Sequence, residues 1–122
     1  MSESIKTVLI AEDEEQLRRL LVRLLSGAGF TLLVAENGQA AWELLQTHQG
    51  TIDLLLSNIV MPHMTGVELA ERASKARPEM KILLISAYDE GLLVLGKGWM
   101  FLAKPFSPKA LLEKIHEVLS LP

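Results

Sequence analysis

Apolar residues form five short runs along the chain, and longer stretches with helical spacing separate these runs. The runs predict strands at residues 7–11, 31–35, 52–57, 81–86 and 99–103. Polar residues hardly interrupt them, which is typical of parallel strands buried on both faces. The pattern therefore predicts an α/β domain of the (βα)5 type, with helices on both sides of a five-stranded parallel sheet.

Apolar spacing and end signals indicate a helix after the first strand. Apolar residues recur there at i, i+3, i+4, i+7 and i+8, and Gly27 and Gly29 end the segment. The basic residues Arg18, Arg19 and Arg23 are expected on its solvated face. The residues expected to face the core are Leu17, Leu20, Leu21, Leu24 and Leu25.

Capping residues mark the starts of three later helices. Asn37 suits the cap of the second helix, and Thr65 with Glu68 has the spacing of a capping box. Ser107 followed by Pro108 suits an N-cap and a first helical position. Helices are therefore expected to begin directly after residues 37, 65 and 107.

Length, charge and composition exclude several classes of protein. The chain has 122 residues, 49% of them hydrophobic, which fits one domain with its own core. It lacks cysteine, which excludes a disulfide scaffold and thiol chemistry, and its net charge of −3 gives no basic field for nucleic acid. No apolar stretch is long enough to span a membrane, and a cytoplasmic location is expected.

Polar side chains come at the ends of four predicted strands. Glu12 and Asp13 follow the first strand, Asn58 the third, Ser86 ends the fourth and Lys104 follows the fifth. In open parallel sheets the ligand site lies at the carboxyl ends of the strands. Paired carboxylates suit Mg²⁺, and a lysine with a hydroxyl suits a phosphoryl group. These residues are therefore the candidate site.

Four motifs in order resemble one family. They are Val8-Leu-Ile-Ala-Glu-Asp13, Asp53-Leu-Leu-Leu-Ser-Asn-Ile-Val-Met-Pro62 followed by Met64 and Gly66, Leu83-Leu-Ile-Ser-Ala87, and Phe101-Leu-Ala-Lys-Pro-Phe106. Together they resemble the receiver domain of bacterial two-component response regulators. The resemblance implies a flavodoxin-like three-layer sandwich with strand order 2-1-3-4-5. It also implies a single receiver domain over residues 1–122, with no effector domain and no enzymatic activity of its own.

The resemblance also implies a role for each matching position. The acidic pair would bind Mg²⁺ with help from a backbone carbonyl, a hydroxyl and a lysine would bind the phosphoryl group, and an aromatic side chain would follow phosphorylation. The acidic pair is Glu12 and Asp13, and the carbonyl is that of Val60. The hydroxyl is that of Ser86, the lysine is Lys104 and the aromatic side chain is Phe101. The Lys104–Pro105 bond matches one that is usually cis in the family.

Some of these residues also suit purely structural roles. Asp13 is a reasonable cap for the first helix, with Gln16 completing a capping box. Phe101 is equally suited to core packing. Both interpretations stay open at this point.

Asn58 departs from the family pattern, because it stands where the family has its phosphoacceptor aspartate. A neutral amide is a poor nucleophile, so Asn58 is not expected to form an acyl phosphate. One negative charge at 4 Å is worth about 4 kcal/mol gross at an effective dielectric near 20, so Mg²⁺ binding should weaken. Asn58 stays a candidate metal ligand beside Glu12, Asp13 and Val60, because its side chain can still offer a neutral oxygen. Three explanations stay open: an engineered Asp-to-Asn change, a natural degenerate receiver, or deamidation restoring Asp.

The segment from residue 89 to 99 is shorter than usual for the family and rich in glycine, so residues 89–96 are expected to form a short helix or loop. Together with Gly50-Thr-Ile-Asp53, it resembles receivers fused to sensor histidine kinases. The partners implied are a histidine kinase or phosphotransfer protein. A homodimer through residues 89–96, the fifth strand and the last helix is also implied.

Three functions are compatible with the sequence. The first is a phosphorelay receiver with its acceptor blocked by Asn58, and the second is a pseudo-receiver that binds partners without phosphorylation. The third is a small flavodoxin-like enzyme or nucleotide binder that uses the acidic pair. The lack of a glycine-rich phosphate loop after the first strand argues against the third.

Overall fold

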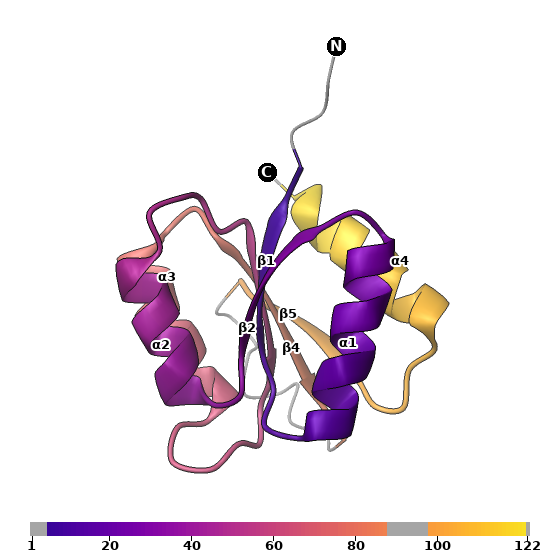
Figure 1. Cartoon of the computed structure of the whole chain (residues 1–122), viewed down its shortest axis with the longest axis horizontal. Helices are drawn as coiled ribbons and strands as arrows, with labels where there is room; N and C mark the ends of the chain where they lie inside the picture. The colour runs from indigo at the N-terminus through magenta and orange to yellow at the C-terminus, as the bar shows by residue number, and fades with distance from the viewer. Residues whose placement is uncertain (1–4, 88–97, 122) are drawn as a thin grey trace.

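A computed structural model of the chain describes residues 5–87 and 98–121. Five parallel strands form one sheet in the order β2-β1-β3-β4-β5. Helices α2 and α3 cover one face of the sheet, and α1 and α4 cover the other (Figure 1). The elements are β1 Thr7–Ala11, α1 Glu15–Gly27, β2 Thr31–Ala35, α2 Gly38–Thr47, β3 Leu54–Asn58, α3 Gly66–Ala76, β4 Lys81–Ser86, β5 Met100–Ala103 and α4 Pro108–Leu119.

The predicted parallel α/β sandwich and its strand order are confirmed. Alternate residues of each central strand enter two separate cores, since successive side chains point to opposite faces of a sheet. In β1, Leu9 packs with α2 and α3, whereas Val8 and Ile10 pack with α1 and α4. Burial on both faces is the reason why the strands are nearly continuous apolar runs.

The predicted helix caps are also confirmed. The Asn37 side chain accepts a hydrogen bond from the Ala40 N–H at 2.7 Å at the start of α2. Thr65 and Glu68 form the reciprocal capping box of α3, and Ser107 caps α4. Each cap provides an acceptor for N–H groups that have no partner within the helix.

Several local predictions were wrong. Strand β3 runs over Leu54–Asn58 rather than 52–57, so Asn58 is the last residue of the strand, and β5 begins at Met100 rather than at residue 99. Leu20 is 39% exposed, because it lies about 100° around α1 from the buried Leu21 and so falls outside the core-facing stripe. The prediction for residues 89–96 lies outside the described residues. Within residues 5–87 and 98–121, no helix is long and apolar enough to cross a membrane.

Candidate functional site

The carboxyl ends of β1, β3 and β4 bring three polar side chains into the interior. Glu12, Asn58 and Ser86 are 0%, 8% and 1% exposed. Backbone hydrogen bonds align the strand ends here: the Ile59 N–H donates to the Ile85 carbonyl at 2.9 Å and the Lys104 N–H to the Ser86 carbonyl at 2.8 Å. The predicted convergence of these strand ends is therefore present.

The Asn58 side chain links two of the predicted metal ligands. Its Nδ2 donates to the Val60 carbonyl at 3.0 Å and to Glu12 Oε2 at 3.4 Å. The Val60 carbonyl and an ionised Glu12 carboxylate can accept hydrogen bonds but cannot donate them. The amide must therefore present its NH₂ group rather than its oxygen to them. The amide thus lies between two oxygens that the sequence analysis assigned to a cation.

Glu12 is the most perturbed carboxyl group of the site. Burial raises its pKa above the ordinary value, and contact with the Asp13 carboxyl and its charge add to this effect. The Glu14 N–H, which donates to Glu12 Oε2 at 3.0 Å, and the positive charge of Lys104 lower the pKa in opposition. Glu12 Oε1 is buried and has no hydrogen-bond partner among the described residues.

The remaining predicted residues lie around this centre. Asp13 is exposed beside Glu12, Lys104 is half-buried, and Val60 is 53% exposed, although its carbonyl accepts from Asn58. Phe101 is half-buried in β5 and packs against the core on the α2 and α3 side. The Lys104–Pro105 bond is cis, as the resemblance implied.

The capping interpretation of Asp13 was wrong. Helix α1 begins at Glu15, and the residue at its N-cap position is Glu14, whose side chain forms no capping bond. Asp13 therefore lies one residue too early to cap the helix. Its exposed carboxylate is left at the rim of the site beside Glu12.

The residues present fit a divalent cation. The orphaned Glu12 Oε1, the adjacent Asp13 carboxylate and the Val60 carbonyl are hard oxygen donors, which Mg²⁺ prefers, and Mg²⁺ needs only one or two protein carboxylates. Residues 5–87 and 98–121 contain no group of three or more acidic, histidine or cysteine side chains placed to hold a metal. At the end of β3 the residue beside Glu12 is Asn58, which offers an amide and no carboxylate.

Gly66 determines how closely α3 approaches the end of β3. A Cβ atom on Gly66 would lie 2.2 Å from the Asn58 carbonyl oxygen and 2.9 Å from the Ile59 Cα atom. Only a residue without a side chain fits there without moving the backbone. The close approach of α3 to β3 is therefore the physical reason for glycine at this position of the motif.

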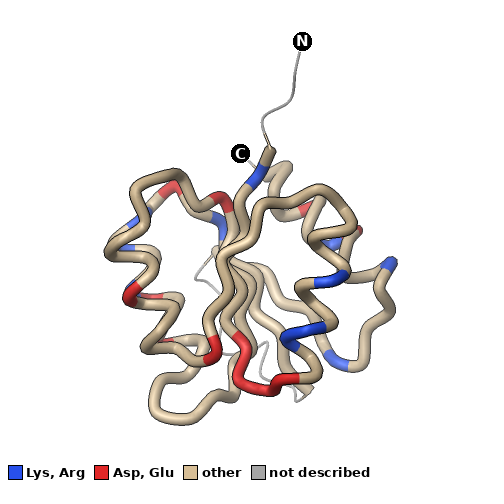
Figure 2. The backbone as a smooth tube through the Cα atoms, viewed as in Figure 1, with Lys and Arg blue, Asp and Glu red and all other residues tan. Residues whose placement is uncertain are grey.

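Arg18 is a site neighbour that the sequence analysis misplaced. Its Nη1 donates to the Glu12 carbonyl at 3.1 Å and to the Asp13 carbonyl at 3.5 Å. Arg18 is half-buried, whereas Arg19 and Arg23 are exposed as expected. Helical spacing placed all three on a polar face but could not show that one of them bends back over the preceding loop. In Figure 2 the acidic run at the end of β1 lies next to the basic residues of α1.

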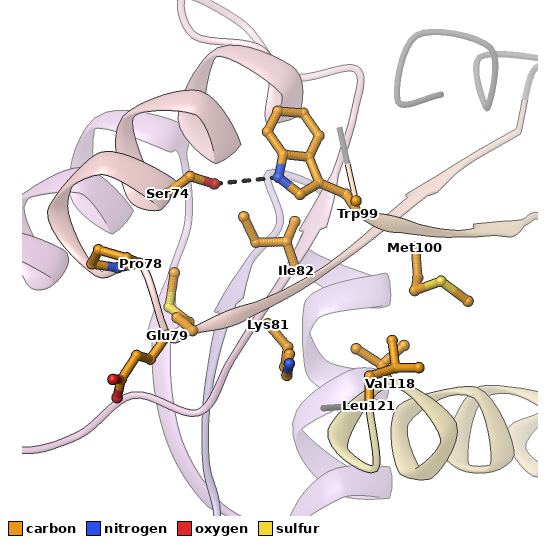
Figure 3. A pocket seen from close by; sticks show the side chains of 11 residues that line it. Ser74, Pro78, Glu79, Lys81, Ile82, Trp99, Met100, Val118 and Leu121 are labelled. Carbon is orange, nitrogen blue, oxygen red and sulfur yellow. Dashed lines mark hydrogen bonds between the residues drawn. The ribbon is translucent and has the colours of Figure 1, made fainter. Parts of the chain in front are cut away.

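A cavity of about 590 Å³ lies at the opposite end of the sheet (Figure 3). It is bordered by the end of α3, the starts of β4 and β5 and the end of α4, and the Trp99 indole N–H donates to Ser74 Oγ at 3.2 Å across one wall. Because parallel strands begin here and end at the acidic pair, the cavity is separate from the candidate site.

Comparison with known proteins identifies the family. The profile described as "Response regulator receiver domain" matches residues 8–116. The response regulator receiver protein CpdR of Brucella abortus (strain 2308) is 37% identical over 119 residues, which cover 94% of this chain and 98% of CpdR. The sensor kinase CckA of the same organism is 36% identical over 117 residues, which cover 93% of this chain but 12% of CckA.

A solved structure agrees with the sequence comparisons. The receiver domain from the hybrid histidine kinase CckA matches with a TM-score of 0.82 and 32% identity, covering 93% of this chain and 99% of that one. The chain thus spans nearly all of one relative and about an eighth of another.

Proposed function

The chain belongs to the response regulator receiver domain family of two-component signalling, and we propose that it is a receiver in which Asn58 blocks phosphorylation. Receivers of this family are generally signalling modules without enzymatic activity of their own. The observation that carries the proposal is the position of the Asn58 amide at the end of β3, with hydrogen bonds to Glu12 and to the Val60 carbonyl. An amide nitrogen conjugated to its carbonyl cannot attack phosphorus as a carboxylate oxygen does.

The surrounding residues have the chemistry that phosphoryl transfer needs. Glu12, Asp13 and the Val60 carbonyl would hold Mg²⁺, which when bound neutralises charge on a phosphoryl group. The half-buried Lys104 would add a second positive charge at the mouth of the site, and the buried Ser86 hydroxyl would bind a phosphoryl oxygen. Phe101, half-buried in β5 opposite Leu84 of β4, would follow the change in occupancy.

The amide also weakens the site for a cation. Its NH₂ group already satisfies Glu12 Oε2 and the Val60 carbonyl, and the site carries one negative charge fewer than with an aspartate. A cation must break these hydrogen bonds before it can bind the same oxygens. We therefore expect Mg²⁺ to bind more weakly to this chain than to its Asn58→Asp variant.

A histidine kinase or a phosphotransfer protein is the partner that this function requires. The similarity to CckA, a sensor kinase, supports a partner of this kind, although the shared part is only 12% of CckA. Dimerisation through residues 89–96, β5 and α4 stays a prediction, and residues 89–96 lie outside the described part of the chain.

A pseudo-receiver that binds partners without phosphorylation is the second candidate. The hydrogen bonds of Asn58 favour it, because they give Glu12 Oε2 and the Val60 carbonyl a partner without metal or phosphate. The codon for residue 58 in the natural gene distinguishes the two candidates. A codon for Asn supports the pseudo-receiver, whereas a codon for Asp supports the blocked receiver.

Phosphorylation of the Asn58→Asp variant tests the proposal. We expect this variant, treated with a small acyl phosphate and Mg²⁺, to gain the mass of one phosphoryl group, while the unchanged chain gains none. Intact-protein mass spectrometry provides the measurement. Asn37→Asp is the matched control, because it makes the same chemical change at a helix cap where Asp serves equally well.

Labelling of the unchanged chain to the same extent would contradict the block at Asn58. An Asn58→Asp variant that stays unlabelled with several acyl phosphates and with phosphohistidine donors would contradict the assignment of this position as the acceptor. Labelling of the Asn37→Asp control would show that another residue accepts the group.

A further inference from the structure

Arg18 crosses from α1 back to the loop that carries the acidic pair. Its guanidinium donates to the main-chain carbonyls of Glu12 and Asp13, at 3.1 and 3.5 Å, and not to their carboxylates. Its neighbour Arg19 instead forms an exposed ion pair with Glu15 at 2.8 Å. Of these two adjacent arginines in α1, one therefore bonds to main-chain carbonyls of the loop and the other to a side chain of its own helix.

The position of Arg18 has an electrostatic cost that its contacts offset. The N-terminus of a helix carries partial positive charge, so a cation close to it is unfavourable by about 0.3–1 kcal/mol. Helix α1 also lacks a side-chain cap at Glu14. Arg18 donates to the two preceding carbonyls, and the Glu14 N–H donates to Glu12 Oε2. These hydrogen bonds hold the loop before α1, which has no side-chain cap to do so.

We propose that Arg18 is a positioning residue, which fixes the backbone of Glu12 and Asp13 so that their carboxylates face the metal position. The proposal rests on the proposed role of this pair in holding Mg²⁺. Removing a group that hydrogen-bonds to a metal-ligating residue commonly lowers metal affinity by about 10–100-fold. Arg18 acts through main-chain atoms, so an effect near the lower end, about tenfold, is expected.

A positioning role and a simple charge effect predict opposite changes in Mg²⁺ affinity when Arg18 is removed. If Arg18 acted only as a nearby positive charge, its removal would strengthen binding of another cation. If it positions the acidic pair, its removal weakens binding although the repulsion has gone. Arg19 has the same charge one residue along and no bond to the loop, so Arg19→Met is the matched control.

Two measurements test the proposal. In the Asn58→Asp background, calorimetric titration with MgCl₂ should give about tenfold weaker binding for Arg18→Met, partial recovery for Arg18→Lys, and a change within about twofold for Arg19→Met. In the otherwise unchanged chain without metal, NMR should show faster hydrogen exchange at the Glu14 amide in Arg18→Met but not in Arg19→Met. That amide is protected only while the Glu12 carboxylate stays in place.

Tighter or unchanged Mg²⁺ binding in Arg18→Met would overturn the proposal, as would a Glu14 amide that exchanges at the unaltered rate. If the Asn58→Asp parent bound no Mg²⁺ at all, the proposed metal site would fall. The exchange measurement would still decide whether Arg18 holds the acidic loop, because it requires no metal.

Discussion

The two ends of the sheet hold their charged side chains in different ways. At the end where the strands begin, Arg77 donates to the carbonyls of Leu45, His48 and Gly50 at 2.7–3.0 Å. Asp53 accepts from the Thr7 N–H at 2.8 Å at the same end. At the carboxyl end, Glu12 is fully buried, yet one of its oxygens has no partner among the described residues.

This difference separates charged side chains with hydrogen-bond partners from a buried carboxylate whose hydrogen bonding is incomplete. A buried polar group without a partner costs about 1–3 kcal/mol, so the partnerless Glu12 Oε1 destabilises the fold. Arg77, in contrast, donates to three carbonyls, one in the last turn of α2 and two just after that helix. The completeness of hydrogen bonding therefore distinguishes the structural end of the sheet, where the strands begin, from the functional end, which carries the candidate site.

The largest expected effect lies at the structural end. Arg77→Ala removes three hydrogen bonds from one charged group and should lower the free energy of unfolding by about 3 kcal/mol. Urea denaturation measures the change, and Arg72→Ala, at an exposed arginine of α3, the helix that ends just before Arg77, should stay within about 0.5 kcal/mol. Equal losses in both variants would mean that the carbonyl contacts of Arg77 contribute nothing specific.

A smaller effect of opposite sign is expected at the functional end. Glu12→Gln removes a buried charge, keeps an oxygen for the Glu14 N–H and adds an amide that can donate to Asp13. The free energy of unfolding at neutral pH should therefore rise by about 1 kcal/mol. Glu43→Gln, an exposed carboxyl in α2, should change it by less than about 0.5 kcal/mol.

The pH dependence of the Glu12 effect follows from its raised pKa. The folded state binds this proton more tightly than the unfolded state, so ionised Glu12 destabilises the fold above the raised pKa. That cost fades as the pH falls through the raised pKa toward the ordinary value of 4.5. The advantage of Glu12→Gln should fade over the same range, and an advantage independent of pH would exclude ionisation as its cause.

The sequence predicted most of the fold because each pattern has a local physical origin. Strands β1 and β4 are apolar between their ends because they are buried there on both faces. Asn37, Thr65 and Ser107 cap helices through contacts with residues nearby in the sequence. Leu20 was misplaced because helical spacing shows a stripe but not the edge of the contact with the sheet.

The sequence predicted which side chains meet at the strand ends, but not the hydrogen bonds that they form. The ends of parallel strands bring Glu12, Asn58 and Ser86 into the interior whatever their side chains do. That Asn58 bonds to Glu12, and that Arg18 bonds to the loop before its own helix, depends on side-chain geometry that no residue spacing encodes.

We propose that the Asn58 amide occupies the place where the site would hold a cation. Thermal unfolding with and without MgCl₂ tests it directly in the unchanged chain and in Asn58→Asp. A ligand at 100 times its Kd stabilises a fold by about 2.7 kcal/mol, so Mg²⁺ should clearly raise the Tm of the Asn58→Asp variant at concentrations that leave the unchanged chain almost unaffected. Equal Mg²⁺-induced shifts in Tm for the two proteins would contradict the claim.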